Sequence, residues 1–165
     1  MAPRVVLVGP MGAGKTTVGR ILAERWGTGV RDTDEDVEAV VGKSVQDIFV
    51  DDGEAAFRAL EKAAVRRALA EHDGVLSLGG GAVLDPDTRA LLAGRPVVFL
   101  RVGLADASRR VGLGQGRPLL LGNVRSRIKA LLEERNPVYE AVAALVVDTD
   151  GRTPAEVAAE IEEKL

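Results

Sequence analysis

The chain has 165 residues, of which 46% are hydrophobic and 28% are charged, which predicts one globular domain with a buried core. It contains no cysteine, so disulfides, thiolate nucleophiles and cysteine-ligated zinc are excluded. The net charge of −3, without any block of lysine or arginine, argues against nucleic acid, and the apolar runs are too short for a signal peptide or a membrane span.

Short β-branched runs alternate with longer helical patterns along the chain. The expected strands are 4–9, 29–32, 74–80, 95–102 and 144–149. The expected helices are 15–27, 33–41, 44–50, 54–72, 86–93, 104–111, 123–140 and 154–164. This alternation predicts a doubly wound α/β fold with a five-stranded parallel sheet, whose ligands bind beyond the carboxyl ends of the strands.

The first expected strand leads into a phosphate-binding motif. "GPMGAGKT" (9–16) matches GxxxxGK[ST] and opens a helix, so backbone N–H groups and the helix dipole converge on one point. Lys15 is expected to reach the β- and γ-phosphates and Thr16 to ligate magnesium. The motif predicts a nucleoside triphosphate bound with Mg²⁺.

Nucleotide binding leaves three classes of protein open: a small-molecule kinase, a GTPase switch and a non-catalytic binding module. A GTPase should carry DxxG early in the chain and [NT]KxD later. The one DxxG, at 148–151, follows the last expected strand, and [NT]KxD does not occur. The GTPase interpretation is therefore disfavoured.

An acidic run, "VRDTDED" (30–36), follows the second expected strand. If the strand continues through Asp34, Asp32 and Asp34 point to the same face, towards the phosphate loop. The alternative for each acid is helix capping or exposure to solvent, and this alternative is favoured for Glu35 and Asp36.

Two further segments carry candidates for substrate binding. Arg58 lies beside an apolar stripe of its helix, within reach of Glu54 and Glu61, and a surface ion pair is the plain alternative. The third strand ends in "LGGGA" (78–82), and three successive glycines favour either close backbone approach to a ligand or a turn that ends the strand.

The segment "VGLGQGRPLLLGN" (111–123) is rich in glycine and is interrupted by Pro118, so we expect a mobile flap. It carries Arg117, and the next helix carries Arg135. An arginine on such a flap is typical of a lid that closes over a triphosphate.

Taken together, the motifs resemble shikimate kinase across essentially the whole chain. They are "GPMGAGKTT", "DTD" (32–34), the pattern GE..FR..E (53–61), "LGGGAV" (78–83), "RPLL" (117–120) and ER.PVYE (134–140). The resemblance implies a single-domain three-layer α/β/α P-loop kinase fold, with a phosphate loop (9–17), a substrate-binding region (33–61) and a lid (112–123). It also implies transfer of the γ-phosphoryl group of ATP, with Mg²⁺, to the 3-hydroxyl of shikimate, a step towards chorismate and the aromatic amino acids.

The resemblance also implies roles for individual residues. The expected catalytic residues are Lys15, Asp34 and Arg117, and the expected metal ligands are Thr16 and, through water, Asp32. The expected ATP-binding residues are Gly12, Ala13, Gly14, Lys15, Thr16, Thr17, Arg110, Arg117, Arg152 and Pro154. The expected shikimate-binding residues are Asp34, Phe49, Phe57, Arg58, Gly79, Gly80, Gly81 and Arg135.

Another small P-loop kinase, for gluconate or a nucleoside monophosphate, is the rival enzyme, and the DTD, GGG and RPLL motifs argue against it. We further expect a cytoplasmic monomer that binds neither nucleic acid nor membrane.

Overall fold

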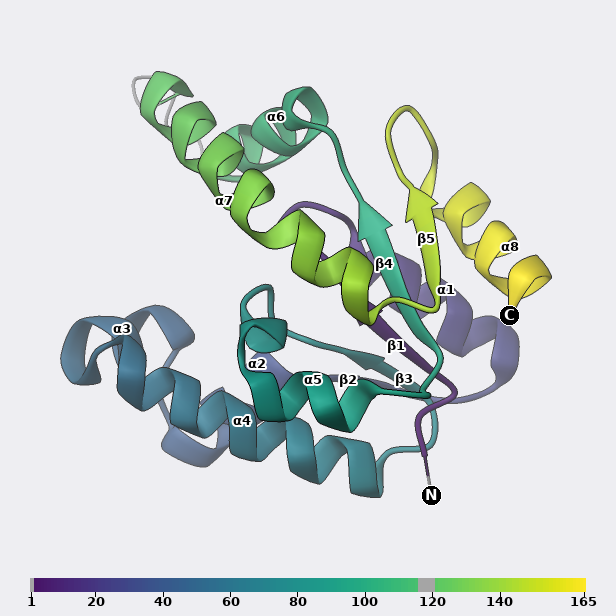
Figure 1. Cartoon of the computed structure of the whole chain (residues 1–165), viewed down its shortest axis with the longest axis horizontal. Coiled ribbons are helices and arrows are strands. Elements are labelled where there is room, and N and C mark those ends of the chain that lie inside the picture. Colours follow the sequence, from purple (N-terminus) through teal and green to yellow (C-terminus); the bar gives the residue numbers. More distant parts are fainter. Residues whose placement is uncertain (1, 116–120) are drawn as a thin grey trace.

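The computed structural model describes residues 2–115 and 121–165, with side chains for 2–110 and 125–165. A five-stranded parallel sheet lies at its centre, in the order β2-β3-β1-β4-β5 (Figure 1). The strands are β1 (Val5–Val8), β2 (Val30–Asp32), β3 (Val75–Ser77), β4 (Val97–Arg101) and β5 (Leu145–Asp148). Because β1 is the middle strand, the loop that follows it lies at the centre of the carboxyl edge of the sheet.

Helices cover both faces of the sheet, which confirms the three-layer α/β/α prediction (Figure 1). They are α1 (Lys15–Trp26), α2 (Thr33–Val41), α3 (Val45–Asp52), α4 (Glu54–Glu71), α5 (Pro86–Leu92), α6 (Leu104–Gln115), α7 (Leu121–Val142) and α8 (Pro154–Lys164), with a 3-10 turn, η1 (Ala82–Leu84). None of the helices in the described ranges is long and apolar enough to cross a membrane.

Side-chain alternation in β1 divides the main core into two parts. Val5 and Leu7 point to the face covered by α1 and α8, whereas Val6 and Val8 point to the face covered by α4 and α5. All four side chains are buried, and each contributes about 1.5–3 kcal/mol relative to an exposed position. The continuous apolar run of β1 thus reflects a strand buried on both faces.

A third, smaller core lies apart from the sheet. It joins α2, α3 and α4 through Val37, Ile48, Phe57 and Ala64, all of which are buried. In Figure 1 these helices extend beyond the β2 edge of the sheet.

Two expectations about the elements are wrong in part. The third strand ends at Ser77 instead of residue 80, because the backbone turns at the glycines. The expected flap is partly helical, since α6 continues to Gln115 and α7 begins at Leu121. Glycine inside a helix costs about 1 kcal/mol relative to alanine, which weakens a helix without forbidding it.

Candidate active site

A pocket of about 630 Å³ lies at the carboxyl edge of the sheet. This volume falls in the usual range for small-molecule sites. The phosphate loop, the end of β2, helices α3, α4 and α7 and the glycines after β3 supply its wall. The expected site residues in the wall are Gly12, Gly14, Lys15, Thr16, Thr17, Asp32, Asp34, Phe49, Phe57, Arg58, Gly79, Gly80, Gly81 and Arg135.

The phosphate loop passes close to the neighbouring strand β4. Gly9 has a φ of 148°, and a Cβ there would lie 2.7 Å from the backbone oxygen of Leu100, so only glycine fits. The loop ends at Gly14, and α1 begins at Lys15 with no acidic residue in its first turn. Ala13 is buried, and its N–H donates to Pro10 O at 3.2 Å. The first turn of α1 therefore presents its N–H groups at the pocket.

The pKa of the Lys15 ammonium is lowered to about 8, chiefly because the group is buried, with Arg135 acting in the same direction and Asp32 and Asp34 opposing it. Its Nζ donates to Gly9 O at 2.6 Å and to Pro10 O at 3.1 Å. A lysine held in this way is cationic at neutral pH and is placed against the loop that binds phosphate.

The strand ends at Asp32, so the condition under which Asp32 and Asp34 would share one face of a strand is not met. Asp32 is the last residue of β2 and the N-cap of α2, and its Oδ1 accepts from the backbone N–H groups of Asp34 at 2.8 Å and Glu35 at 3.4 Å. Asp34 lies in the first helical turn. Both carboxyl groups nevertheless line the pocket, because the helix begins at its edge.

Asp34 is held in an unfavourable environment for a charge. Burial raises its pKa to about 6, and the nearby carboxylates of Asp32 and Glu61 add to the shift while Lys15 opposes it. Its Oδ1 is buried and accepts no hydrogen bond from the rest of the described chain. Because buried polar atoms are normally paired, this oxygen points to a hydrogen-bond donor supplied by a ligand.

Arg58 forms a partly buried ion pair, which excludes the alternative of a plain surface pair. Its Nη1 lies 2.8 Å from Glu61 Oε1, and the Glu61 side chain is only 4% exposed. Burial raises the pKa of Glu61, whereas Arg58 lowers it. The guanidinium carbon of Arg58 lies 5.3 Å from the ring centre of Phe57 and 5.9 Å from that of Phe49, within cation–π distance. Glu61 therefore fixes an arginine at the pocket wall.

Charged side chains lie against all three glycines after β3, and at Gly79 and Gly81 they would collide with a Cβ. A Cβ on Gly79 would be 2.6 Å from Asp34 Oδ1, and one on Gly81 would be 2.5 Å from both terminal nitrogens of Arg58. A Cβ on Gly80 would lie 3.5 Å from Arg135 Nη1. The sequence predicted either close backbone approach to a ligand or a turn that ends the strand. In the structure the side chains of Asp34, Arg58 and Arg135 approach the glycine backbone.

Replacing Gly81 by alanine should displace Arg58 without unfolding the protein, because the clash is with the far end of a flexible side chain. We expect the KM for the acceptor substrate to rise about 10-fold, as for one weakened charged hydrogen bond, with the melting temperature nearly unchanged. Steady-state kinetics and thermal denaturation check this. Gly29→Ala is the matched control, since a Cβ there meets nothing closer than 4.0 Å. An unchanged KM in the Gly81 variant would contradict the contact.

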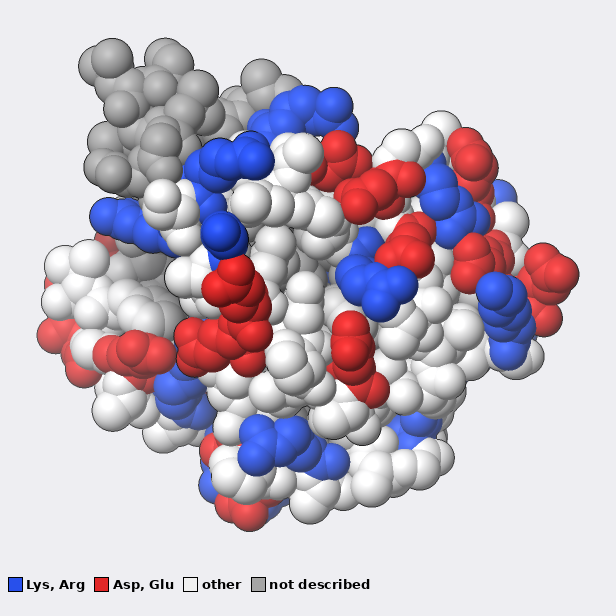
Figure 2. Space-filling view, turned by 45° about the horizontal axis from the view of Figure 1, so that its top comes forward, with Lys and Arg blue, Asp and Glu red and all other residues white. Residues whose placement is uncertain are grey.

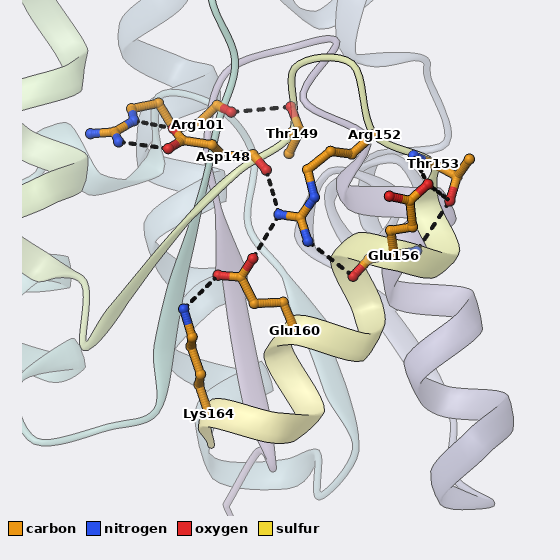
Figure 3. Close-up of polar contacts among 8 residues, drawn as sticks. All are labelled: Arg101, Asp148, Thr149, Arg152, Thr153, Glu156, Glu160 and Lys164. Carbon is orange, nitrogen blue, oxygen red and sulfur yellow. Dashed lines mark hydrogen bonds and ion pairs between the residues drawn. The ribbon is translucent and has the colours of Figure 1, made fainter.

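Two of the expected adenine-side residues lie outside the pocket wall. Arg152 donates to Glu160 Oε1 at 2.7 Å, to Asp148 O at 2.9 Å and to Glu156 O at 3.3 Å, so it is tied to α8 (Figure 3). Pro154 is the first residue of α8, whose start carries the expected capping box of Thr153 and Glu156.

Arg110 lies nearer to the phosphate loop, since its Nη1 donates to Gly12 O at 2.7 Å. Arg117 and the whole of the expected lid (112–123) lie outside the residues whose side chains the structure describes. The adenine contacts therefore stay predictions.

A family model described as shikimate kinase matches residues 11–165. The chain belongs to the shikimate kinase family. It is 62% identical to the shikimate kinase of Streptomyces coelicolor over 156 residues, which cover 94% of this chain and 91% of the relative. It also resembles the solved structure of a shikimate kinase from Acinetobacter baumannii in complex with shikimate, with a TM-score of 0.89, 34% identity and coverage of 99% of this chain and 92% of that one. A gluconokinase from Sinorhizobium meliloti, 23% identical with a TM-score of 0.57 over 95% of this chain and 87% of that one, shares only the fold.

Sequence reasoning about this shikimate kinase missed three buried residues beside the pocket. Glu61 was seen only as a surface partner of Arg58, and no role was expected for Thr33 or Tyr139. Glu61 could have been found from its position three residues after Arg58, one helical turn away. Thr33 and Tyr139 could have been found from their places inside the DTD and PVYE motifs. Burial, which decides their importance, depends on contacts far apart in the sequence.

Proposed function

We propose that the protein transfers the γ-phosphoryl group of ATP to the 3-hydroxyl of shikimate, giving shikimate 3-phosphate and ADP for chorismate and aromatic amino acid biosynthesis. One observation carries this proposal: a single pocket joins a phosphate loop to a carboxylate and two arginines suited to a small hydroxylated acid. The complex of the Acinetobacter relative with shikimate supports the choice of substrate.

At the acceptor end of the pocket, Arg58 and Arg135 bind the shikimate carboxylate. The planar guanidinium fork suits a carboxylate, and Arg58 is already oriented by Glu61. Arg135 Nε is buried without a hydrogen-bond partner in the described part of the chain, which supports a ligand contact there. Phe49 and Phe57, whose ring centres are 4.7 Å apart, flank the shikimate ring, and Gly79, Gly80 and Gly81 form the floor.

Asp34 accepts hydrogen bonds from the shikimate hydroxyls. With a pKa of about 6, it is mostly ionised at neutral pH and able to take the proton of the attacking hydroxyl. Phosphoryl transfer passes through a loose transition state in most analyses, so orientation of the attacking oxygen matters more than removal of its proton.

At the donor end, Gly12, Ala13, Gly14, Lys15, Thr16 and Thr17 bind the phosphate chain of ATP. Thr16 and Asp32 are oxygen donors that fit a magnesium ion, because Mg²⁺ prefers oxygen ligands and uses few protein carboxylates. Asp32 Oδ1 caps α2, which leaves its second oxygen for this role. When bound, magnesium neutralises charge on the transferring group. Arg117 adds to this from the lid, and Arg110, Arg152 and Pro154 pack around the adenine.

An ATP-consumption assay across a panel of acceptors tests the substrate. We expect turnover with shikimate and at least about 100-fold lower kcat/KM with gluconate or nucleoside monophosphates. A nucleoside monophosphate has no carboxylate for the arginines, and the open chain of gluconate must lose conformational freedom to present its carboxylate and a hydroxyl group together. A coupled measurement of ADP release, with ATP alone as the control, gives the rates. Equal activity with gluconate would overturn the substrate, and ATP binding without any transfer would indicate a non-catalytic module.

The protein works as a cytoplasmic monomer in this proposal, without nucleic acid or membrane as a partner. Figure 2 shows basic side chains grouped at the upper left of the face that it draws, with acidic ones below them and to the right, and the net charge of −3 gives the chain no overall attraction for nucleic acid.

A further inference from the structure

The glycine strip, defined as Gly79, Gly80 and Gly81, is held at two points by side-chain hydroxyl groups. The N–H of Gly79 donates to Thr33 Oγ1 at 3.1 Å, and the hydroxyl of Tyr139 donates to the carbonyl oxygen of Gly80. Thr33 and Tyr139 are both fully buried, and neither lines the pocket. The two hydroxyl groups therefore act behind the pocket wall.

The strip needs such support because glycine has no preferred backbone conformation. Three successive glycines lose more conformational freedom on folding than any other tripeptide. The strip begins after β3 ends at Ser77, so its position is not fixed by strand pairing. Its carbonyl groups also accept local turn bonds, from Ala82 N–H to Gly79 O and from Leu84 N–H to Gly81 O, both at 3.1 Å, and the two hydroxyl groups tie the strip to α2 and α7.

The same strip supports the side chains that face the substrate. A Cβ on Gly79 or Gly81 would lie 2.6 Å from Asp34 Oδ1 or 2.5 Å from the Arg58 guanidinium, whereas one on Gly80 would be in ordinary van der Waals contact with Arg135 Nη1, at 3.5 Å. A shift of the strip by a few tenths of an ångström would therefore act on the Asp34 carboxylate and the Arg58 guanidinium first, and would also change the contact with Arg135.

Both supporting residues come from the elements that carry these side chains. Thr33 stands between Asp32 and Asp34 at the start of α2, and Tyr139 stands one helical turn after Arg135 on α7, on the same face of the helix. The ring of Tyr139 packs on Phe99 of β4, with ring centres 5.0 Å apart, which ties the strip to the main core. Each hydroxyl thus sets the distance between the strip and one substrate-binding side chain.

We propose that Thr33 and Tyr139 are positioning residues for the acceptor substrate: their hydroxyls fix the glycine strip from two sides and so set the geometry of Asp34, Arg58 and Arg135. This inference rests on the proposed function, and it concerns affinity for a small hydroxylated carboxylic acid. A purely structural role, in which the hydroxyls only satisfy buried backbone groups, predicts a loss of stability with unchanged substrate affinity.

Three variants separate the two roles. Thr33→Val keeps the shape of the side chain and removes the hydroxyl, Thr33→Ser keeps the hydroxyl, and Tyr139→Phe removes one oxygen atom. We expect Thr33→Val and Tyr139→Phe each to raise the KM for shikimate about 10-fold, the effect of one buried hydrogen bond, and to change the KM for ATP less than about 2-fold. Thr33→Ser should retain a KM close to that of the unaltered protein.

Steady-state kinetics with one substrate varied at a time, together with thermal denaturation of each variant, decide the outcome. An unchanged KM for shikimate in both hydroxyl-deleted variants would overturn the proposal, as would an equal rise in both KM values. If one variant does not fold, the other decides, and failure of both to fold would assign the hydroxyls to folding alone and also overturn it. The unaltered protein is measured alongside, and its failure to phosphorylate shikimate would instead overturn the proposed function.

Discussion

Replacing Asp34 by asparagine should remove most of the turnover and, at neutral pH, make the folded protein more stable. The variant keeps the size of the side chain and loses its charge. We expect kcat to fall about 10²- to 10³-fold, because the attacking hydroxyl exchanges an anionic acceptor that can take its proton for a neutral amide that cannot. Stability should rise because the protein holds this carboxylate partly buried, near Asp32 and Glu61, with one oxygen unpaired within the described chain.

The direction of the stability change follows from the pKa of Asp34. Folding raises it from 3.8 to about 6, so between these values the native state binds more protons than the unfolded state, and stability falls as the pH rises through this window. Asparagine does not titrate. The variant should therefore gain about 1–2 kcal/mol at pH 7, after allowance for the solvent that reaches the carboxyl group, and lose this advantage near pH 4.

Urea denaturation at pH 4 and pH 7, combined with kinetics at pH 7, measures both effects. Asp36→Asn is the matched control, because Asp36 lies on the same helical turn but pairs with Arg31 at 2.7 Å away from the pocket wall. That control should keep its kcat and gain no stability at pH 7. Near-normal turnover of the Asp34 variant, or an equal gain in stability at both pH values, would contradict the role of Asp34.

Replacing Arg58 by alanine should weaken shikimate binding and also destabilise the fold, for two separable reasons. The substrate loses a charged hydrogen-bond partner, so its KM should rise about 100-fold. Glu61 keeps its buried position and loses its cation, which should cost about 3 kcal/mol. The KM for ATP should change little, because Lys15, Thr16 and the phosphate loop are untouched.

A double variant, Arg58→Ala with Glu61→Gln, separates these two effects. The neutral amide needs no cation, so most of the lost stability should return while the KM for shikimate stays high. Glu61→Gln alone serves as the control for any effect of the amide itself. Recovery of shikimate affinity in the double variant would show that Arg58 acts only by neutralising Glu61, and equal losses of affinity for both substrates would show general misfolding.

The fold was predictable because its signals are local. The apolar run of β1 and the pattern GxxxxGK[ST] identify a buried strand, a loop and a helix within 12 consecutive residues, 5–16. The ends of the helices and strands were harder to predict from the sequence. Asp32, for example, can either continue a strand or cap a helix, and which it does depends on where strand pairing stops.

The site was predictable where a motif carries the chemistry and was missed where tertiary burial carries it. Asp34, Arg58 and Arg135 were expected and do line the pocket. Glu61, Thr33 and Tyr139 looked ordinary because a helical glutamate, a threonine between two aspartates and a tyrosine in a helix each have common surface uses. The hydrogen-bond partner of Glu61 is three residues away, and those of Thr33 and Tyr139 are 46 and 59 residues away. Only the folded chain shows that all three residues are buried, which distinguishes a buried role from a surface one.

The small core of α2, α3 and the first turns of α4 gives the acceptor side of the pocket packing of its own. Four buried side chains, Val37, Ile48, Phe57 and Ala64, form this core, whereas Val65, Ala68 and Leu69 further along α4 belong to a core of the sheet. Segments with few buried contacts open at a lower free energy than the whole domain. We therefore expect amide hydrogen exchange to be faster in α2, α3 and the first turns of α4, which carry Asp34, Phe49 and Arg58, than in the central strands of the sheet.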